Sequence, residues 1–322
     1  MPDVFEAYDD LDDLAMRLQV ADPGARRVAV IELGNSGDPA AVSFLAPLVS
    51  DTDPGVRQQV AQALGEFDGP AAAKVLAALL VDADEAVASA AADSMAELKD
   101  PASADLLLPL VDNRDAFVRA STLRALKELR RRDALKPALD ALRDVEPAVR
   151  VQAIGVIGFL KIEEAVPALT AATADPDTQV RRAAVSSLAF SNLKPAADSV
   201  MRALSDKDWL VRETAAETLG VMKNGLQAAS ALLAVLSDEF WQVRLKAARS
   251  LGKLKVREAV TGIAANLTHE QANLRKEAAA ALGEIADPAA TPYLEGVQND
   301  PDPEVRKNAR WAVQRILLGN SN

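Results

Sequence analysis

The sequence contains no cysteine and only one histidine, His269, among its 322 residues. The lack of cysteine excludes disulfides, thiolate nucleophiles and cysteine-ligated zinc or iron–sulfur sites within the chain. A single histidine excludes a multi-histidine metal site. The sequence also lacks the G-x-S-x-G nucleophile motif, the Walker A motif and the dinucleotide-binding fingerprint. We therefore expect a protein that is not an enzyme and that holds no cofactor or metal of its own.

Aromatic residues make up only 4% of the chain, and long apolar runs are missing. Without about 20 consecutive apolar residues, no segment is expected to span a membrane. The start of the chain, residues 1–13, is acidic and lacks the basic and then apolar order of a signal peptide. These absences favour a cytoplasmic protein without a membrane partner.

Positive charge is scarce in the first third of the chain. Residues 1–100 carry 19 acidic and 6 basic side chains, whereas residues 101–322 carry 28 acidic and 30 basic ones. This distribution disfavours nucleic acid as a partner, because binding to phosphates requires clustered lysine and arginine. The acidic end would suit a basic protein surface, or it would simply keep the protein soluble.

An arginine recurs every 31 residues, with one extra residue before Arg244 and a vacancy at Ala88. A valine or leucine precedes most of these arginines. The arginines are Arg26, Arg57, Arg119, Arg150, Arg181, Arg212, Arg244, Arg275 and Arg306. Self-similarity at this period indicates a stack of repeats, and such stacks usually hold other molecules.

Each repeat is expected to contain two antiparallel helices. In the second repeat, Asp53 is suited to cap a helix and Pro54 to occupy its first position. Apolar residues then follow at spacings of four, four and three, which is one face of a helix. They are Val56, Val60, Leu64 and Phe67. Gly65 and Gly69 are expected to let the chain turn before the next helix begins at Pro70.

An aspartate lies six residues before most of these arginines. This pattern resembles the HEAT repeat, and the short period resembles the bacterial branch named after phycobilisome lyases. The resemblance covers about residues 4–317 and implies an all-α fold. That fold is a right-handed α-solenoid superhelix of about ten two-helix repeats. It also implies an aspartate–arginine ladder between the turns. The ladder residues are Asp51, Arg57, Asp144, Arg150, Asp175, Arg181, Asp206, Arg212, Asp238 and Arg244.

Three positions depart from the ladder pattern. Ala88 replaces an arginine, Asn113 replaces an aspartate, and His269 replaces another aspartate as a neutral turn residue. Because Ala88 and Asn113 alter two successive rungs of the ladder, the junction near residues 82–119 is expected to be softer than the others.

Residues 1–322 are expected to form a single solenoid. In it, repeats 1–3 are acidic, repeats 4–8 carry an apolar strip and repeats 9–10 form the C-terminal end. The resemblance implies that the second helices line a concave surface. The apolar strip on that face comprises Phe117, Val151, Phe159, Phe190, Leu210, Val221 and Leu245. An exposed apolar strip with a polar border is typical of a binding site.

The aromatic residues of this region also have a structural interpretation. Phe159 and Phe190 would complete the core if they fold under the following turn. Trp209 and Trp241 share one position in successive repeats. They would either pack on the adjacent turn or contribute to recognition.

The sequence favours a bacterial, monomeric scaffold or adaptor that binds another protein in its concave groove. There are two alternatives, the first of which the resemblance implies. One is a phycobilin lyase subunit or bilin chaperone. The other is an accessory protein that stabilises a metallocofactor, such as an iron–sulfur cluster, on a partner assembly protein.

Overall fold

The computed structural model describes residues 11–319, and the first ten residues of the acidic start lie outside the described range. All regular structure in that range is helical, with no β-strand. The chain divides into two compact units, Met1–Leu160 and Lys161–Asn322. That the whole chain forms a single solenoid stays a prediction.

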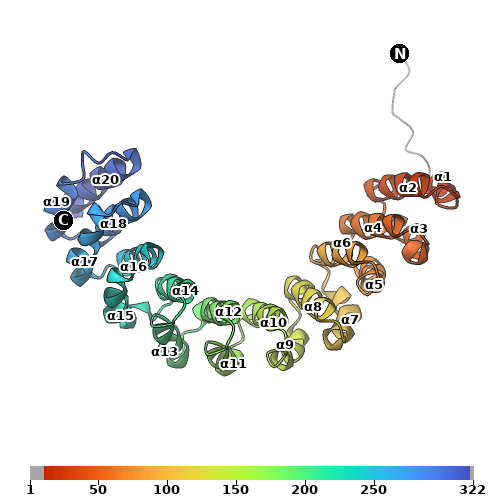
Figure 1. Ribbon diagram of the computed structural model, residues 1–322, viewed down its shortest axis with the longest axis horizontal. Coiled ribbons are helices and arrows are strands. Elements are labelled where there is room, and N and C mark those ends of the chain that lie inside the picture. Colours follow the sequence, from red (N-terminus) through yellow and green to blue (C-terminus); the bar gives the residue numbers. More distant parts are fainter. Residues whose placement is uncertain (1–10, 320–322) are drawn as a thin grey trace, which may run out of the picture. The chain divides into compact units, whose positions relative to one another are not determined.

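In the first unit, odd-numbered and even-numbered helices form two separate layers, as Figure 1 shows. The odd-numbered helices are α1 (Leu11–Arg17), α3 (Ala41–Leu45), α5 (Pro70–Leu79), α7 (Ala104–Leu107) and α9 (Leu135–Ala141). The even-numbered helices are α2 (Pro23–Asn35), α4 (Pro54–Ala63), α6 (Glu85–Met95), α8 (Ala116–Leu129) and α10 (Pro147–Leu160). Each even-numbered helix packs against the next even-numbered one.

The second unit repeats this arrangement. Its odd-numbered helices are α11 (Val166–Ala172), α13 (Lys194–Ala203), α15 (Ala229–Ala234), α17 (Val260–Ala264) and α19 (Thr291–Glu295). Its even-numbered helices are α12 (Thr178–Ser187), α14 (Trp209–Leu219), α16 (Trp241–Lys253), α18 (Ala272–Ile285) and α20 (Pro303–Gly319). Most odd-numbered helices are short, so the even-numbered layer provides most of the helical length.

Short 3₁₀ helices extend or introduce many of these helices. The first six are η1 (Ala46–Ser50), η2 (Leu64–Glu66), η3 (Pro101–Ser103), η4 (Leu108–Asp112), η5 (Arg132–Ala134) and η6 (Glu163–Ala165). The others are η7 (Leu188–Phe190), η8 (Gly225–Ala228), η9 (Val235–Ser237), η10 (Arg257–Ala259), η11 (Ala265–Thr268) and η12 (Pro288–Ala290). The described helices are too short, too polar, or both, to serve as membrane spans.

Capping aspartates fix where most even-numbered helices begin. The Asp53 carboxylate accepts a hydrogen bond from the backbone N–H of Val56 at 3.0 Å, as the sequence predicted. Asp84 and Asp115 cap α6 and α8 in the same way, and Asp177 and Asp208 cap α12 and α14. These caps matter because the first N–H groups of a helix have no partner within it.

The predicted apolar face forms the core. Val56, Val60 and Leu64 of α4 and η2 are completely buried, and Phe67 is almost so. Equivalent valines and leucines are buried in both units, including Val149 in α10 and Val211 in α14. Burying this face between two layers supplies most of the free energy of folding, because no single pair of helices covers it.

A glycine near the end of several even-numbered helices allows close packing on the next helix. A Cβ atom added to Gly252 would lie 2.9 Å from the Cα of Ala281, and one added to Gly34 would lie 2.9 Å from the Cβ of Ala63. Gly65 has the same role against Ser94. The sequence assigned both Gly65 and Gly69 to a turn, but only Gly69 adopts a positive φ, +92°. For Gly65 the prediction was wrong, because it serves close helix contact.

We expect Gly252→Ala to lower the midpoint of urea unfolding and Gly155→Ala to raise it. Neither glycine has a positive φ, and both lie within helices. The added methyl at 252 would meet the backbone of α18 and cost about 1–3 kcal/mol. At 155 it would meet only the flexible Lys127 side chain at 3.7 Å, so the helix would gain about 0.5–1 kcal/mol. Equal effects of both substitutions would contradict this account of Gly252.

Candidate functional site

Most of the repeating arginines join the turn of their own repeat to the turn of the next, as Arg57 does. Arg57 donates from Nε and Nη2 to the carboxylate of Asp82, at 2.7 and 2.9 Å. Its Nη1 atom donates to the backbone carbonyl of Asp51 at 2.7 Å. Both side chains are largely buried. Bidentate bonds between ionised groups are short and directional, so this contact fixes the two turns relative to each other.

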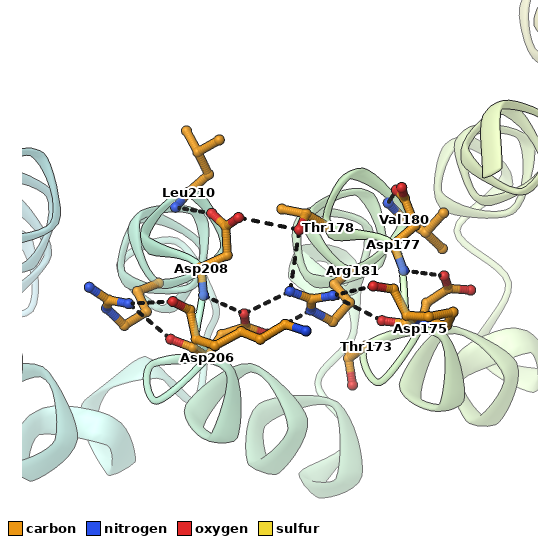
Figure 2. Close-up of polar contacts among 12 residues, drawn as sticks. Thr173, Asp175, Asp177, Thr178, Val180, Arg181, Asp206, Asp208 and Leu210 are labelled. Atoms are coloured by element: carbon orange, nitrogen blue, oxygen red, sulfur yellow. Dashed lines mark hydrogen bonds and ion pairs between the residues drawn. The ribbon is translucent and has the colours of Figure 1, made fainter.

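The same pairing recurs in both units, and each such arginine–carboxylate pair is termed a rung here. The partner aspartate lies 25 or 26 residues after the arginine. The rungs are Arg26–Asp51, Arg57–Asp82 and Arg119–Asp144 in the first unit, and Arg181–Asp206, Arg212–Asp238 and Arg275–Asp300 in the second. Figure 2 shows how Arg181 reaches Asp206 and also bonds the backbone carbonyl of Asp175.

Two predicted ladder residues lie on either side of the division between the units. In the first unit, Arg150 donates from Nη1 to the backbone carbonyl of Asp144 at 2.8 Å. In the second unit, the carboxylate of Asp175 accepts the backbone N–H of Asp177 at 2.9 Å. Both therefore make the contacts that ladder residues make within their own repeats.

The rungs lower the pKa of their carboxyl groups. Hydrogen bonds from Arg57 lower the pKa of Asp82 below its ordinary value of 3.8, and Arg119 and Arg275 do the same for Asp144 and Asp300. Burial by itself would raise the pKa of Asp206, but the bonds from Arg181 and the backbone outweigh it. Folding therefore favours the ionised form of these carboxylates.

Ala88 and Asn113 occupy the two ends of one rung. They are separated by the same 25 residues as the paired positions, and the rungs on either side, Arg57–Asp82 and Arg119–Asp144, are complete. The interpretation that two successive pairs are altered was therefore wrong. No arginine faces position 113, because Ala88 stands at the other end of this rung. A neutral side chain suits the position, since a partly buried carboxylate without a partner would lower stability.

His269 takes the place of an aspartate opposite Arg244. Its Nε2 atom lies 2.7 Å from Nη2 of Arg244, and its Nδ1 atom accepts the backbone N–H of Gln271. A neutral imidazole has only one ring nitrogen that can accept a hydrogen bond, so it cannot satisfy both donors. The buried Nε atom of Arg244 has no hydrogen-bond partner in the described structure. Histidine is therefore a weaker partner here than a carboxylate.

The first unit contributes Phe117, Val151 and Phe159 to the apolar strip. Phe117 and Phe159 are 44% and 38% exposed, whereas Val151 is half-buried. The guanidinium of Arg130, at the end of α8, lies over the ring of Phe159 at 5.0 Å from its centre. This cation–π contact holds Arg130 beside the ring. Phe159 is therefore partly exposed and also packs against the guanidinium of Arg130.

The second unit contributes Phe190, Leu210, Val221 and Leu245. Val221 is 57% exposed, and the other three are half-buried. The strip predicted from the sequence includes residues of both units, so its continuity stays a prediction.

Trp209 stacks on an aromatic residue that the sequence had placed only beside Trp241. The rings of Trp209 and Phe240 are 5.2 Å apart between centres and inclined by 8°. Phe240 also lies under the guanidinium of Arg212, at 5.6 Å. The stack joins the starts of α14 and α16 beside the Arg212–Asp238 rung. Trp241 is half-buried. Phe240 follows Asp238 by two residues, and Asp238 pairs with Arg212 of the preceding repeat. This proximity in the sequence could have indicated that Phe240 lies near the start of α14.

Metal-binding residues do not gather in the described part of the chain. No group of three or more histidine, cysteine, aspartate or glutamate side chains is placed to hold a metal ion between residues 11 and 319.

The family model for HEAT repeats matches residues 11–95, 110–189, 135–220, 171–236 and 229–314. Together these matches cover most of the sequence. The chain belongs to the HEAT-repeat family. No curated protein matched it.

Solved structures with similar folds include Kap95p with RanGDP, at 15% identity and a TM-score of 0.66, covering 96% of this chain and 51% of Kap95p. A Kap95–Nup1 complex has 16% identity and a TM-score of 0.60, with 96% and 51% coverage. An engineered protein has 21% identity and a TM-score of 0.50, with 96% and 99% coverage. At these identities the likeness concerns the fold, and this chain spans about half the length of the Kap95 chains.

We expect His269→Asp to stabilise the second unit by about 1–3 kcal/mol, because a carboxylate would bond both Nε and Nη2 of Arg244. The matched control is Asn113→Asp, which introduces the same side chain at a ladder position without an arginine opposite. The control should leave stability unchanged or lower it. Urea unfolding of both variants measures the change in the free energy of unfolding. If Asn113→Asp also stabilises the protein, pairing with Arg244 does not explain the effect of His269→Asp.

Acidification should weaken the rungs. Because the pKa of Asp82 is lower in the folded than in the unfolded protein, its contribution is complete above the ordinary value of 3.8 and is lost as the pH falls through the lowered value. Asp82→Asn should therefore cost about 1–3 kcal/mol at neutral pH and much less below that range. Urea unfolding across this range is the measurement. The control is Asp93→Asn, which removes a carboxylate that is 73% exposed and should have little effect at any pH. A cost for Asp82→Asn that does not change with pH would contradict the assignment.

Proposed function

We propose that this protein is a non-catalytic scaffold that binds another protein through the apolar strip, whose residues lie on the even-numbered helices or directly after them. The observation that carries the proposal is the exposure of large apolar side chains there: Phe117, Phe159 and Val221. Apolar side chains that gather at the surface of a charged protein usually mark an interaction site, and aromatic residues supply much of the binding energy.

The solved relatives support a protein partner. Two structures with the same fold contain Kap95 with another protein, Ran in one and Nup1 in the other. A solenoid suits this function because its layers present a long and regular surface. The finer assignment places the chain in the short-period, phycobilisome-lyase-like branch as a bacterial, cytoplasmic monomer. It rests on the 31-residue period and the absence of cysteine.

The test is the double substitution Phe159→Glu and Phe190→Glu in the full chain. A tagged protein is purified from its own source, and the proteins that accompany it are identified. A partner present in a fixed ratio with the wild type should be lost with the double variant. Circular dichroism and urea unfolding establish that the variant remains folded.

The matched control is Val145→Glu and Leu226→Glu. These side chains are 83% and 60% exposed and lie outside the strip, one in each unit. The control should retain the partner, because it adds the same charge to apolar surface elsewhere. If the Phe159 and Phe190 variant retains the partner, the proposal that the apolar strip binds it is wrong.

The two alternative functions give different results in the same purification. A bilin lyase subunit or bilin chaperone would change the absorption spectrum of added bilin. An accessory protein for a metallocofactor would retain a coloured partner. Either result would replace the scaffold proposal.

A further inference from the structure

The missing rung leaves a cavity in the first unit. It has a volume of about 690 Å³ and lies between the turns that precede α6 and α8. Ala88 and Asn113, the two ends of the missing rung, both line it. The rungs on either side of it are complete, and α6 packs against α8. Among the described residues of the first unit, the cavity lies at the junction where the arginine–carboxylate pair is missing.

The backbone around the cavity offers acceptors that an arginine uses elsewhere. Nη1 of Arg119 donates to the carbonyls of residues 113 and 114, and Arg181 and Arg275 make the equivalent pairs of bonds. At the vacant position the equivalent carbonyls belong to Asp82 and Ala83, which both line the cavity. The methyl group of Ala88 donates no hydrogen bond to them.

Asn113 determines which donors fit best. Its Oδ1 atom accepts the backbone N–H of Asp115 at 2.9 Å, as the ladder aspartates do for the N–H two residues on. A carboxylate has a second acceptor oxygen, whereas Asn113 has the donor Nδ2 in its place. The candidate acceptors at the cavity are therefore the remaining lone pair of the Asn113 amide oxygen and the backbone carbonyls of Asp82 and Ala83, with the Nδ2 donor of Asn113 beside them. Such acceptors suit the N–H groups of an ammonium or a guanidinium.

The cavity wall also suits a long, positively charged side chain. Three acidic residues line it and no basic residue does: Glu85, Asp115 and Asp82, of which Asp82 is already paired with Arg57. Glu85 makes no ion pair among the described residues. Val81 and Phe117, 50% and 44% exposed, provide apolar surface on the same wall. Lysine and arginine place their apolar stems on such surfaces while the charged head reaches polar groups.

We propose that the cavity at Ala88 and Asn113 binds a basic side chain, lysine or arginine, from a peptide segment of a partner protein. The partner's cation takes the position that the ladder arginine occupies in neighbouring repeats. This inference rests on the proposed function, because the ligand is a partner protein. It adds that the partner presents a lysine or arginine side chain. The excess of acidic residues in the first 100 positions favours the same kind of partner.

The test is a titration of the full chain, labelled at its alanine methyl groups, with three blocked tripeptides followed by NMR. The central residue is arginine, lysine or citrulline, the last having the shape of arginine without its charge. The arginine or lysine peptide should shift the Ala88 methyl signal saturably, with a dissociation constant on the order of 1 mM. Citrulline should bind at least several-fold more weakly. The better of the two charged peptides identifies the preferred cation.

Three variants locate the binding. Ala88→Arg with Asn113→Asp restores the rung and should abolish the response, which is then read on the alanine methyls of neighbouring repeats. Glu85→Gln should weaken binding several-fold, and Asn113→Asp should strengthen it several-fold. Equal binding of citrulline, or unchanged binding by the restored-rung variant, would overturn the proposal. The Phe159 and Phe190 variant should bind the peptides normally, so failure of the strip and failure of this cavity are separate results.

Discussion

The bidentate pair between an arginine and the aspartate of the next repeat is the contact on which the register of the stack depends. Hydrophobic burial is not directional, so apolar layers alone would tolerate sliding and rotation between neighbouring helices. The guanidinium of Arg57 meets two carboxylate oxygens and one backbone carbonyl at fixed distances. Since the same geometry recurs in both units, the turns that a complete rung joins have a defined position relative to each other. The capping aspartates and the close contact at Gly252 both fit within this register.

The positions that depart from the pattern are informative because the rest of the pattern is so regular. Ala88 and Asn113 belong to one rung, so an arginine and a carboxylate are missing together and no unpaired charge remains. His269 is different, because Arg244 is present and its Nε atom lacks a partner. One departure leaves a cavity with acceptors, and the other leaves a donor that the histidine does not satisfy. Both are local, since the neighbouring rungs are complete.

The proposed interaction sites consist mainly of residues that belong neither to the buried core nor to the complete rungs. The second helix of each repeat buries one face in the core, and residues of its other face are more exposed. Phe117 and Phe159 are partly exposed, at 44% and 38%, on these helices. Phe117 also lies on the wall of the Ala88 cavity. In this view an acidic cavity and apolar side chains in the same unit would recognise a partner that combines basic and apolar residues.

The sequence by itself determined the period, the two helices of each repeat and the buried face of Val56, Val60 and Leu64, because helical spacing and capping are local properties. It did not determine which aspartate each arginine contacts. That choice depends on how far one turn is displaced from the next, and it made Ala88 and Asn113 one pair. The role of Gly65 and the stack of Trp209 on Phe240 were also decided by tertiary structure, because both depend on distances between neighbouring helices. Local spacing fixes the face of a helix, whereas only packing fixes what that face meets.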